Sequence, residues 1–569
     1  MLDPLKTKNM ANTYDAIVVG SGITGGWAAK ELCEKGLKTL VLERGRKLDH
    51  VGDYPHVSTP PWAFDHRGAV PESVKQDYPV QSTVYAFNDG TLPLWVKDSE
   101  HPYTTPDDRD FTWIRGYHVG GRSLMWGRQC YRWSDLDFAA NAKDGVGIDW
   151  PIRYRDIAPW YSYVERFVGI SGQEENLDQL PDGEFLPPME MNCVEKDVKK
   201  AIESRWSDRK MTIGRVANLT APKDGRSKCQ YRNLCYRGCP FGAYFSSQSA
   251  TLPAAAATGN LTLRPNSVVE SVIYDRDTNR ATGVRIIDAE TRQSEEFFAP
   301  VVFLCASTLN STWILLNSKN DQFDEGLANS SGALGKFLMD HHYRLGARGR
   351  VEGYEDQYYF GARPNGIYVP RFRNVTEQRD DYLRGFGFQG GASRAGWQRG
   401  AGRPGFGEAF KKDLEKPGSW NMNLLGFGEC LPYAQNRVRL NPEVKDVHGL
   451  PTLYINGKFR ENERVMREDI KATAAEMLEA AGVKDIEVYD TNFTLGAGIH
   501  EMGTARMGND PKTSVLNKWN QCHDVPNLYV TDGSCMTSSS CVNPSITYMA
   551  LTARAVDHAV KTLKRDGKI

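Results

Sequence analysis

Long hydrophobic runs and a charge excess of one sign are both missing from this 569-residue sequence. No stretch approaches the roughly 20 consecutive apolar residues that a membrane-spanning helix needs. The 70 basic and 71 acidic side chains leave a formal charge of -1. That balance argues against nucleic acid as a partner, because phosphate binding needs a net basic face. The N-terminal stretch MLDPLKTKNMANTYD has neither an apolar core of signal-peptide length nor a twin-arginine pair, so we expect no membrane span and no export signal within the chain.

A disulfide scaffold is also excluded. Eleven cysteines, an odd number in 569 residues, do not make a disulfide scaffold, and we interpret them as mostly reduced thiols or ligands. Apolar residues make up 40% and charged residues 25% of the chain, which excludes a disordered protein. The length predicts two or more lobes, one inserted into another. A large enzyme is the expected class.

The beginning of the chain predicts a nucleotide-binding βαβ unit. Residues 15–19 (DAIVV) and 38–42 (KTLVL) are short apolar runs typical of buried parallel strands, and the stretch between them is helical up to Gly36. The intervening loop is Gly20-Ser21-Gly22-Ile23-Thr24-Gly25. Its glycines allow a tight turn, a close approach to a pyrophosphate and close packing of helix on strand, in that order.

Glu43 ends the second strand, 23 residues after Gly20. An acid at this place accepts hydrogen bonds from a ribose and disfavours a 2′-phosphate. The unit therefore predicts FAD or NAD rather than NADP. A tight turn without a nucleotide is the alternative.

The remaining elements predict an α/β fold, in which a Rossmann-like domain carries an inserted α+β domain built on an antiparallel sheet. The first domain is expected over 12–190, 225–335 and 490–569, and the inserted domain over 336–489. The pattern predicts loops over 50–110, a hairpin over 262–288, strands at 300–305 and 527–532, a helix over 460–481, a final helix after Asn543, and a long glycine-rich loop over 385–410.

Four further segments carry a resemblance to a known family. They are His118–Gly127 (HVGGRSLMWG), His500–Gly508 (HEMGTARMG), Asn527–Ser534 (NLYVTDGS) and Val542–Thr547 (VNPSIT). With the N-terminal glycine loop, they resemble the glucose–methanol–choline (GMC) family of FAD oxidoreductases. Within that family the chain is most similar to the catalytic subunits of bacterial glucoside 3-dehydrogenase and other FAD-dependent sugar dehydrogenases.

The resemblance implies FAD and assigns residues to its parts. It places Gly20, Gly22, Gly25 and Glu43 on the ADP half, Val269 near the adenine, Asp532 and Gly533 at the pyrophosphate, and Gly121, Ser123, Asn543 and Pro544 near the flavin ring. Pyranose oxidase, a more distant relative, bonds its flavin to a histidine where this chain has Met125. We therefore expect non-covalent FAD.

His500 is the predicted catalytic base. A histidine suits this role because its pKa lies near the working pH, and His500 matches the catalytic histidine of the family's H-x-x-G-T segment. Asn543 matches the second member of the catalytic pair; the alternative is a helix N-cap followed by Pro544 at the first helical position. His341 and His342 are expected to have structural roles, with a place near the site as the alternative. Residues 389–394 (QGGASR) are a candidate for substrate contact.

Cys229, Cys235 and Cys239 crowd into eleven residues. A structural zinc site wants four ligands, and no histidine lies between His118 and His341, so we interpret the three cysteines as iron–sulfur ligands. The resemblance, which extends to the segment Cys239–Ala243 (CPFGA), implies a [3Fe-4S] cluster. A local disulfide with one free thiol and a [4Fe-4S] cluster with a distant fourth ligand remain as alternatives.

The resemblance implies a dehydrogenase that oxidises a secondary hydroxyl of a sugar or glycoside, with a 3-keto-glucoside as the expected product. Its electrons would leave singly through the cluster to a cytochrome c or a quinone. FAD glucose 1-dehydrogenase, a pyranose-oxidase-like sugar oxidase using oxygen, an NAD-dependent dehydrogenase and a non-catalytic flavoprotein subunit are the alternatives. The resemblance also implies a small signal-bearing partner subunit and hence a periplasmic enzyme; a cytoplasmic enzyme is the alternative.

Overall fold

A computed structural model describes residues 12–54, 56–67, 70–357, 363–400 and 403–568; most of the N-terminal stretch examined for an export signal lies outside them. A five-stranded parallel sheet forms the centre of one lobe, in the order β18–β10–β1–β2–β6. Its strands are β1 (Ala16–Val19), β2 (Thr39–Leu42), β6 (Leu261–Arg264), β10 (Val302–Leu304) and β18 (Leu528–Val530). The residues of β1, β2, β10 and β18 are buried on both faces, as parallel strands covered by helices require.

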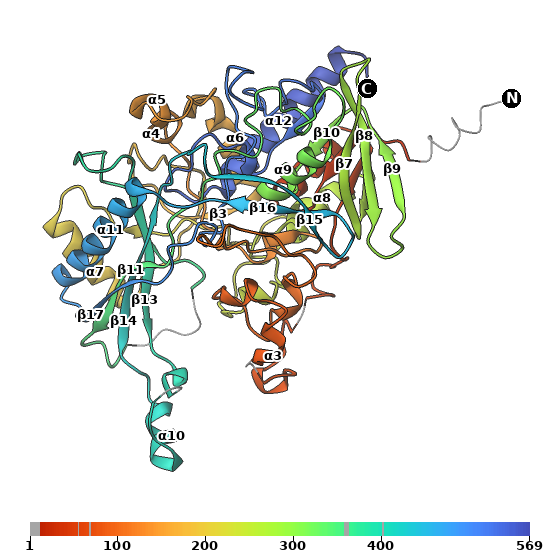
Figure 1. Cartoon of the computed structure of the whole chain (residues 1–569). Coiled ribbons are helices and arrows are strands. Elements are labelled where there is room, and N and C mark those ends of the chain that lie inside the picture. Colours follow the sequence, from red (N-terminus) through yellow and green to blue (C-terminus); the bar gives the residue numbers. More distant parts are fainter. Residues whose placement is uncertain (1–11, 55, 68–69, 358–362, 401–402, 569) are drawn as a thin grey trace.

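The predicted βαβ unit is confirmed. Helix α2 (Ile23–Glu34) joins β1 to β2 and packs against α12 (Ser545–Arg565) and α8 (Leu252–Ala257). Gly36 follows the helix with φ +89°, the left-handed conformation that lets glycine end a helix. The long C-terminal helix α12 also contacts α6 (Tyr154–Val168), as Figure 1 shows near the top of the molecule.

A three-stranded antiparallel sheet flanks this lobe (Figure 1, right). It consists of β7 (Ser267–Asp275), β8 (Arg280–Asp288) and β9 (Ser294–Phe298), so the hairpin predicted over 262–288 is present. Helix α9 (Thr308–Asn317) follows β10 and packs on β7.

A six-stranded antiparallel sheet forms the second lobe, in the order β17–β11–β14–β13–β12–β5. Its strands are β5 (Thr212–Ile213), β11 (Leu345–Val351), β12 (Ile367–Val369), β13 (Phe386–Arg394), β14 (Trp420–Gly428) and β17 (Lys484–Asp490). Helices α11 (Glu461–Ala480) and α7 (Cys193–Arg205) cover one face of the sheet and share a hydrophobic core with it (Figure 1). The segment between 191 and 224, which the prediction left outside both domains, therefore supplies β5 and α7 to this lobe.

The second lobe is not a closed insertion. Its hairpin of β15 (Arg437–Lys445) and β16 (Pro451–Asn456) packs toward α9. Val438, Leu453 and Ile455 of this hairpin belong to the same hydrophobic core as β1 and β10. The two lobes consequently share buried surface.

The loop predicted over 385–410 is wrong in its first half. Residues 386–394 form β13, a central strand paired with β12 and β14. Glycine is needed there because a Cβ on Gly390 would lie 2.0 Å from the Asn423 carbonyl oxygen of β14. Beyond the strand, η7 (Trp397–Gly400) and α10 (Gly407–Glu415) form a projection from the sheet (Figure 1, bottom).

Short elements complete the described chain. In the described part of the segment 50–110, predicted as loops, the helical elements are the short η1 (Pro61–Ala63), α3 (Glu72–Lys75), η2 (Gln81–Thr83) and η3 (Leu92–Leu94). The others are η4 (Gly121–Leu124), α4 (Asp135–Phe138), α5 (Ala140–Asp144), β3 (Ile170–Ser171), β4 (Phe185–Leu186), η5 (Cys235–Arg237), η6 (Ser247–Thr251) and η8 (Gly533–Cys535).

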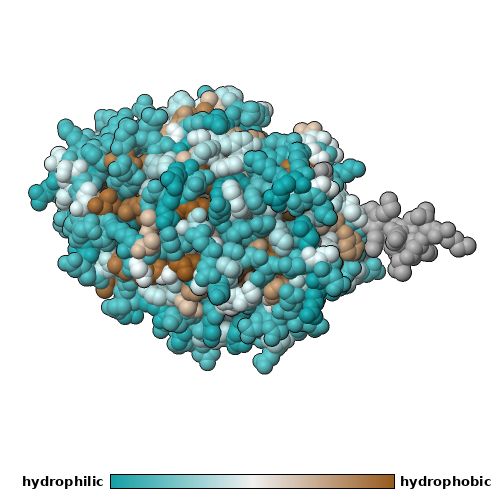
Figure 2. Space-filling model, turned by 90° about the horizontal axis from the view of Figure 1, so that it is seen from above, coloured by the Kyte–Doolittle hydropathy of each residue, from teal (hydrophilic) through white to brown (hydrophobic). Residues whose placement is uncertain are grey.

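Within the described ranges, every helix falls short of the length or hydropathy needed to cross a bilayer. Seen from above, the surface is mostly hydrophilic, with hydrophobic residues showing in several small patches (Figure 2).

Candidate active site

A cavity of about 480 Å³ runs from the carboxyl edge of the parallel sheet to strands β13 and β14 of the six-stranded antiparallel sheet. Residues that follow β1, β2 and β10 line one end, and residues of β13 and β14 line the other. Crevices at the carboxyl ends of parallel strands are where α/β proteins bind nucleotides.

Most of the predicted site residues lie on this one cavity. Its lining includes Gly20, Gly22, Glu43, Gly121, Ser123, Val269, His500, Asp532, Gly533 and Asn543. Gly25 and Pro544 are not among the lining residues, nor are Cys229, Cys235 and Cys239. Gln389, from the segment proposed for substrate contact, lines the cavity, whereas residues 390–394 do not.

The glycine loop builds a cradle at the first end. Gly20 has φ +94°, and a Cβ on Gly25 would lie 1.8 Å from the Gly20 carbonyl oxygen, so α2 lies directly against the turn. A Cβ on Gly22 would meet no atom within 4 Å, because it would point into open space. That open space at a helix N-terminus suits a phosphate.

Glu43 is held in place beside the cradle. Its carboxylate accepts hydrogen bonds from Ser21 N (3.1 Å), Ser21 Oγ (2.6 Å) and Gly45 N (2.9 Å). Burial raises the pKa of Glu43, and these hydrogen bonds act against the rise. Ser267 N donates to the Glu43 carbonyl at 2.8 Å, which brings the start of β7, including Val269, to the same end.

Three helices begin at the cavity wall. The lining includes Ile23 of α2, Thr308 of α9 and Ser545 of α12, each at the first position of its helix. The N-terminus of a helix carries partial positive charge and unpaired N–H groups, so the cavity favours an anionic ligand. Asp532, which precedes Gly533, is already satisfied by Ser311 Oγ (2.5 Å) and by Ser534 N and Oγ (3.0 and 2.6 Å).

FAD fits these residues. The cradle at Gly22, at the N-terminus of α2, leaves room for a pyrophosphate, and the N-termini of α9 and α12 lie on the wall of the same cavity. Three cavity-lining side chains also carry buried polar atoms without a hydrogen-bond partner among the described residues: the Tyr548 hydroxyl, the Nε atom of Arg115, and the Nε and Nη1 atoms of Arg128. Buried polar groups of this kind are normally satisfied, and a polar ligand in the cavity would satisfy them.

His500 meets His341 at the far end of the cavity. Their Nδ1 atoms lie 2.9 Å apart, and Nε2 of His341 lies 3.0 Å from the Ser539 carbonyl oxygen. The carboxylate of Asp340 accepts the backbone N–H groups of Gly498 (2.8 Å) and His500 (2.9 Å). Asp340 and His341 therefore hold the backbone and the ring of His500, respectively.

The electrostatics of this end keep His500 neutral. Burial, followed by His341 and Arg122, holds the pKa of His500 well below 6.5, and burial lowers the pKa of His341 to about 4. Burial and the nearby Glu501 raise the pKa of Asp340 to about 7.

Arg122 and Glu501 form an ion pair beside His500. Arg122 Nη2 lies 2.8 Å from Glu501 Oε2, and Nη1 lies 3.2 Å from Oε1, so the pair is bidentate. Arg122 lines the cavity and the Glu501 side chain is buried. The sequence interpretation named neither residue for the site, although both lie within the quoted family segments.

Asn543 faces the cavity rather than capping a helix. Its Oδ1 accepts a hydrogen bond from Gln389 Nε2 at 2.5 Å. Helix α12 begins at Ser545, Pro544 takes the cap position, and no side chain caps the helix. The N-cap alternative for Asn543 is therefore wrong.

His341 is the main residue that sequence reasoning undervalued. Its only local mark was its place in the run Asp340-His341-His342, and no motif distinguished it from its neighbour. His342 packs edge-on against Phe459, with ring centroids 4.9 Å apart, instead of contacting His500. Only the tertiary structure separates the two histidines.

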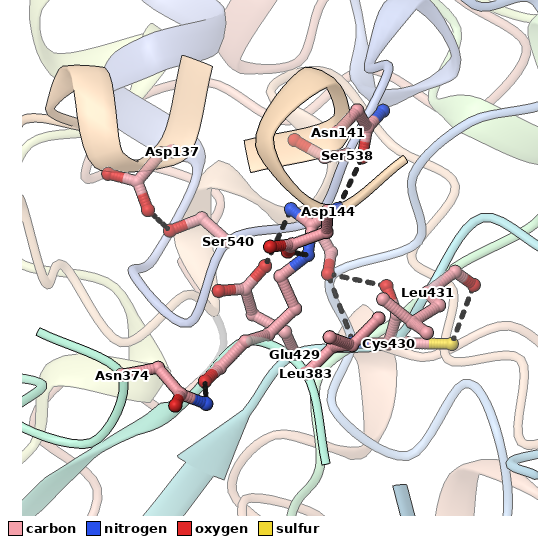
Figure 3. Close-up of polar contacts among 12 residues, drawn as sticks. Asp137, Asn141, Asp144, Asn374, Leu383, Glu429, Cys430, Leu431, Ser538 and Ser540 are labelled. Atoms are coloured by element: carbon pink, nitrogen blue, oxygen red, sulfur yellow. Dashed lines mark hydrogen bonds and ion pairs between the residues drawn. The ribbon is translucent and has the colours of Figure 1, made fainter. Parts of the chain in front are cut away.

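A buried polar network supports the loop that carries Ser539 and Asn543. Arg384 pairs with Asp144 (2.8 Å), donates to Asn141 Oδ1 (2.6 Å) and lies 3.8 Å from Glu429. Figure 3 labels these three partners of Arg384. Figure 3 also shows Ser540 pointing at Asp137, with Oγ 2.6 Å from Oδ1. The network ties α5 of the first lobe to the ends of β13 and β14 of the second, and it ties α4 to the loop that carries Ser539 and Asn543.

All eleven cysteines are free thiols, so the local disulfide considered for the cysteine segment is not seen. Cys229, Cys235 and Cys239 are half-buried, and burial raises the pKa of Cys229, with Cys235 and Cys239 adding to the rise. Across the described residues, no three His, Cys, Asp or Glu side chains come together as ligands of a single metal ion. Tyr236, which follows Cys235, lines the cavity.

The fold and the cavity define a dinucleotide-binding protein of the α/β class. Models of the GMC oxidoreductase family match residues 14–343 and 432–552. The chain therefore belongs to the GMC oxidoreductase family, as the sequence motifs predicted.

Curated relatives match almost the whole chain. The 2-methyl-1,2-propanediol dehydrogenase of Mycolicibacterium austroafricanum is 30% identical, over 96% of this chain and 95% of its own length. The fructose dehydrogenase large subunit of Gluconobacter japonicus is 27% identical, over 98% and 99%. The gluconate 2-dehydrogenase flavoprotein of Pantoea cypripedii is 24% identical, over 96% and 93%.

Solved structures show the same fold. Pyridoxine 4-oxidase from Mesorbium loti aligns with a TM-score of 0.57 at 17% identity, over 96% of this chain and 99% of that one. Formate oxidase from Aspergillus oryzae RIB40 aligns with a TM-score of 0.61 at 14% identity, over 97% and 99%. At these identities the likeness concerns the fold.

Proposed function

We propose that this chain is an FAD-dependent dehydrogenase that oxidises a secondary hydroxyl of a sugar or glycoside, with His500 as the base. The observation that carries the proposal is the meeting of His500 and Asn543 on one cavity with the glycine cradle. Membership of the GMC oxidoreductase family supports oxidation of an alcohol carbon. The fructose and gluconate dehydrogenases among the relatives support a sugar as the substrate.

FAD, when bound, supplies the two-electron acceptor that takes a hydride from the carbinol carbon. Gly20, Gly22 and Glu43 would hold its ADP half, and Asn543 and the N-terminus of α12 would face its ring. We propose that the binding is non-covalent, because Met125 stands where a histidine bonds to the flavin in pyranose oxidase. Met125 lines the cavity.

The side chains supply the proton chemistry. Among the described residues, Nε2 of His500 has no hydrogen-bond partner, and the neutral ring can accept the hydroxyl proton there. Because Gln389 occupies Oδ1 of Asn543, the amide nitrogen of Asn543 is the group left to donate to the substrate oxygen. One group removes the proton while the other orients the oxygen that loses it.

We further propose that Cys229, Cys235 and Cys239 bind a [3Fe-4S] cluster, which would supply one-electron chemistry. The three thiols share one half-buried segment next to cavity-lining Tyr236. In a cluster each cysteine binds a different iron. The three cysteines therefore need not form a site for a single metal ion, which is not seen in the described residues. A cytochrome c or quinone acceptor, a small signal-bearing subunit and a periplasmic location complete the proposal.

A small diol is the second candidate substrate, because the relative at 30% identity is a 2-methyl-1,2-propanediol dehydrogenase. Anaerobic reduction of the flavin separates the candidates. Methyl glucoside, glucose, fructose, gluconate and 2-methyl-1,2-propanediol would each be mixed with the FAD-loaded protein, and a 3-keto product identified by mass spectrometry. Bleaching by methyl glucoside supports the first candidate, and bleaching by the diol alone supports the second.

Iron content and oxygen uptake test the route of the electrons. Iron in the anaerobically purified protein, together with slow oxygen uptake during turnover, would support the dehydrogenase. Flavin without iron and rapid peroxide formation would favour an oxidase. His500→Ala should abolish flavin reduction by substrate while FAD remains bound; retained reduction would remove His500 from the mechanism.

A further inference from the structure

The two histidines leave only one arrangement of protons when both are neutral. A backbone carbonyl only accepts hydrogen bonds, so Nε2 of His341 must carry the proton that lies between it and the Ser539 oxygen, 3.0 Å away. Nδ1 of a neutral His341 is then an acceptor. The bond of 2.9 Å to Nδ1 of His500 must therefore be donated by His500.

We propose that the Ser539 carbonyl, acting through His341, fixes His500 in the tautomer with its proton on Nδ1 and leaves Nε2 free to accept a proton. His341 is on this view a positioning residue. The proposal deepens the proposed function and rests on it only where it assigns the catalytic proton to Nε2. The low pKa values of both rings support the neutral forms that the argument needs.

The carbonyl that starts this chain of hydrogen bonds is itself clamped. Ser539 Oγ donates to the Cys430 carbonyl oxygen (3.0 Å) and accepts from Cys430 N (3.1 Å). Cys430 lies just after β14, next to Glu429 of the Arg384 network (Figure 3). Both lobes therefore hold the Ser539 carbonyl in its orientation.

His500, at the other end of this series of hydrogen bonds, is also held in place. Asp340 binds the N–H groups of Gly498 and His500, so the backbone around His500 is tied to the residue that precedes His341. His500 cannot turn its ring to offer the other nitrogen without breaking the bond to His341. The protein thus selects the reacting nitrogen before the substrate arrives, and a tautomer fixed in this way has a strong effect on catalysis by other enzymes.

The tautomer is measured directly on the FAD-loaded protein. Nitrogen NMR of protein labelled with ¹⁵N-histidine reports the two ring nitrogens, and the signals that disappear in His500→Gln belong to His500. A pyrrole-type Nδ1 and a pyridine-type Nε2 are expected. The opposite pattern would overturn the proposal, whatever the substrate is. If the protein shows the expected NMR signals but oxidises no alcohol, the assignment of the tautomer is supported and the proposed function is wrong.

Matched substitutions test the route through His341. An asparagine amide reaches the place of Nδ1, whereas a glutamine amide reaches the place of Nε2. His341→Asn, which keeps an acceptor for His500, should reduce the rate of flavin reduction by less than about tenfold. His341→Gln removes that acceptor and should reduce the rate by about 10²–10⁴-fold, the range for loss of general base catalysis. His342→Gln, the same change one residue along, should leave the rate near that of the wild type; equal losses in the three variants would contradict the proposal.

A methylated histidine, whose tautomer is fixed chemically, should restore flavin reduction to a variant that lacks His341. In the His341→Ala background, His500→Nδ1-methylhistidine places a methyl group in the vacated space and fixes the lone pair on Nε2. Flavin reduction should recover by at least tenfold over His341→Ala alone. Nε2-methylhistidine at the same position should give no recovery. Recovery with the Nε2 derivative, or with neither, would contradict the assignment.

Discussion

Two glycines of the cofactor cradle should respond in opposite ways to the same added methyl group. In Gly25→Ala the new Cβ would lie 1.8 Å from the Gly20 carbonyl oxygen, a backbone atom that cannot rotate away. Overpacking of this kind costs about 1–3 kcal/mol. Helix propensity alone would favour alanine by about 1 kcal/mol inside α2. The clash outweighs this gain, so the change in the free energy of unfolding is a loss. We expect the apoprotein to lose stability.

In Gly22→Ala the methyl group meets no protein atom within 4 Å and the backbone, with φ -67°, already suits alanine. The apoprotein should keep almost all of its stability. FAD should bind more weakly because the methyl group displaces the phosphate from an N–H donor. Loss of one charge-assisted hydrogen bond, about 1.5–3 kcal/mol, corresponds to a rise in Kd of about 10- to 150-fold.

The assay pairs thermal unfolding of the apoprotein with fluorescence titration of FAD. Gly36→Ala is the control, because its left-handed φ of +89° makes alanine unfavourable while no atom lies near the new methyl group. It should lower stability moderately without changing the affinity for FAD. A Gly22→Ala apoprotein less stable than Gly25→Ala, or one that binds FAD as tightly as the wild type, would refute the reasoning.

Three further outcomes follow from the site. Because the pKa of His500 lies well below 6.5, its base form persists at and above neutral pH. The rate of anaerobic flavin reduction should therefore show no titration of His500 from pH 6.5 upward, and the loss of its base form should lower the rate only at more acidic pH. A decline centred near pH 7 that remains when Asp340 is replaced by Asn, which removes the other group with a pKa of about 7, would count against His500. Cys235→Ser should remove iron and slow dye reduction while the substrate still bleaches the flavin, whereas unchanged iron content would exclude this cysteine as a ligand. Arg122→Met should destabilise the apoprotein by about 3 kcal/mol, because it leaves Glu501 buried without its partner. The double variant Arg122→Met with Glu501→Leu should recover most of this loss. Additive effects of the two substitutions in thermal unfolding would show that the pair is not coupled.

The parts of the fold that could be predicted are those with a strong local pattern. The β-branched run before Gly20 and the apolar run ending at Glu43 marked two buried strands. The amphipathic period after residue 460 marked α11 (Glu461–Ala480), and the segment after Pro544 marked α12. In each case the side chains that bury the element lie within the element itself.

Glycine misled the prediction at β13. Its glycines read as a mobile loop because they weaken a strand considered alone. In the folded chain they allow the Asn423 backbone and the Glu195 side chain to come close: a Cβ on Gly390 or Gly391 would lie 2.0 or 2.9 Å from their oxygens. This reason lies in chain segments far away in the sequence, so no local pattern carried it.

The candidate site divides in the same way. The cofactor cradle is made by consecutive residues, and its motif carried enough information to place it. His341 and Gln389 act on His500 and Asn543 across separations of 159 and 154 residues. The hydrogen bond that identifies each of them exists only after folding, and their residue types are common elsewhere in the chain.

The order of strands in the parallel sheet bears on how the protein is made. The outer strand β18 (Leu528–Val530) pairs with β10 (Val302–Leu304), which leaves the ribosome more than two hundred residues earlier. At typical speeds of synthesis that interval is roughly 10 to 45 seconds. During this interval the edge of β10 that later pairs with β18 has no partner strand in the nascent chain, and an unpaired strand edge is a known liability for aggregation. His341 likewise lacks Ser539, its hydrogen-bond partner, until that residue has been synthesised. FAD therefore has a complete pocket only after β18 and Asn543 have been synthesised, more than two hundred residues after β10. We expect a chaperone that shields this edge until then to raise the yield of active enzyme.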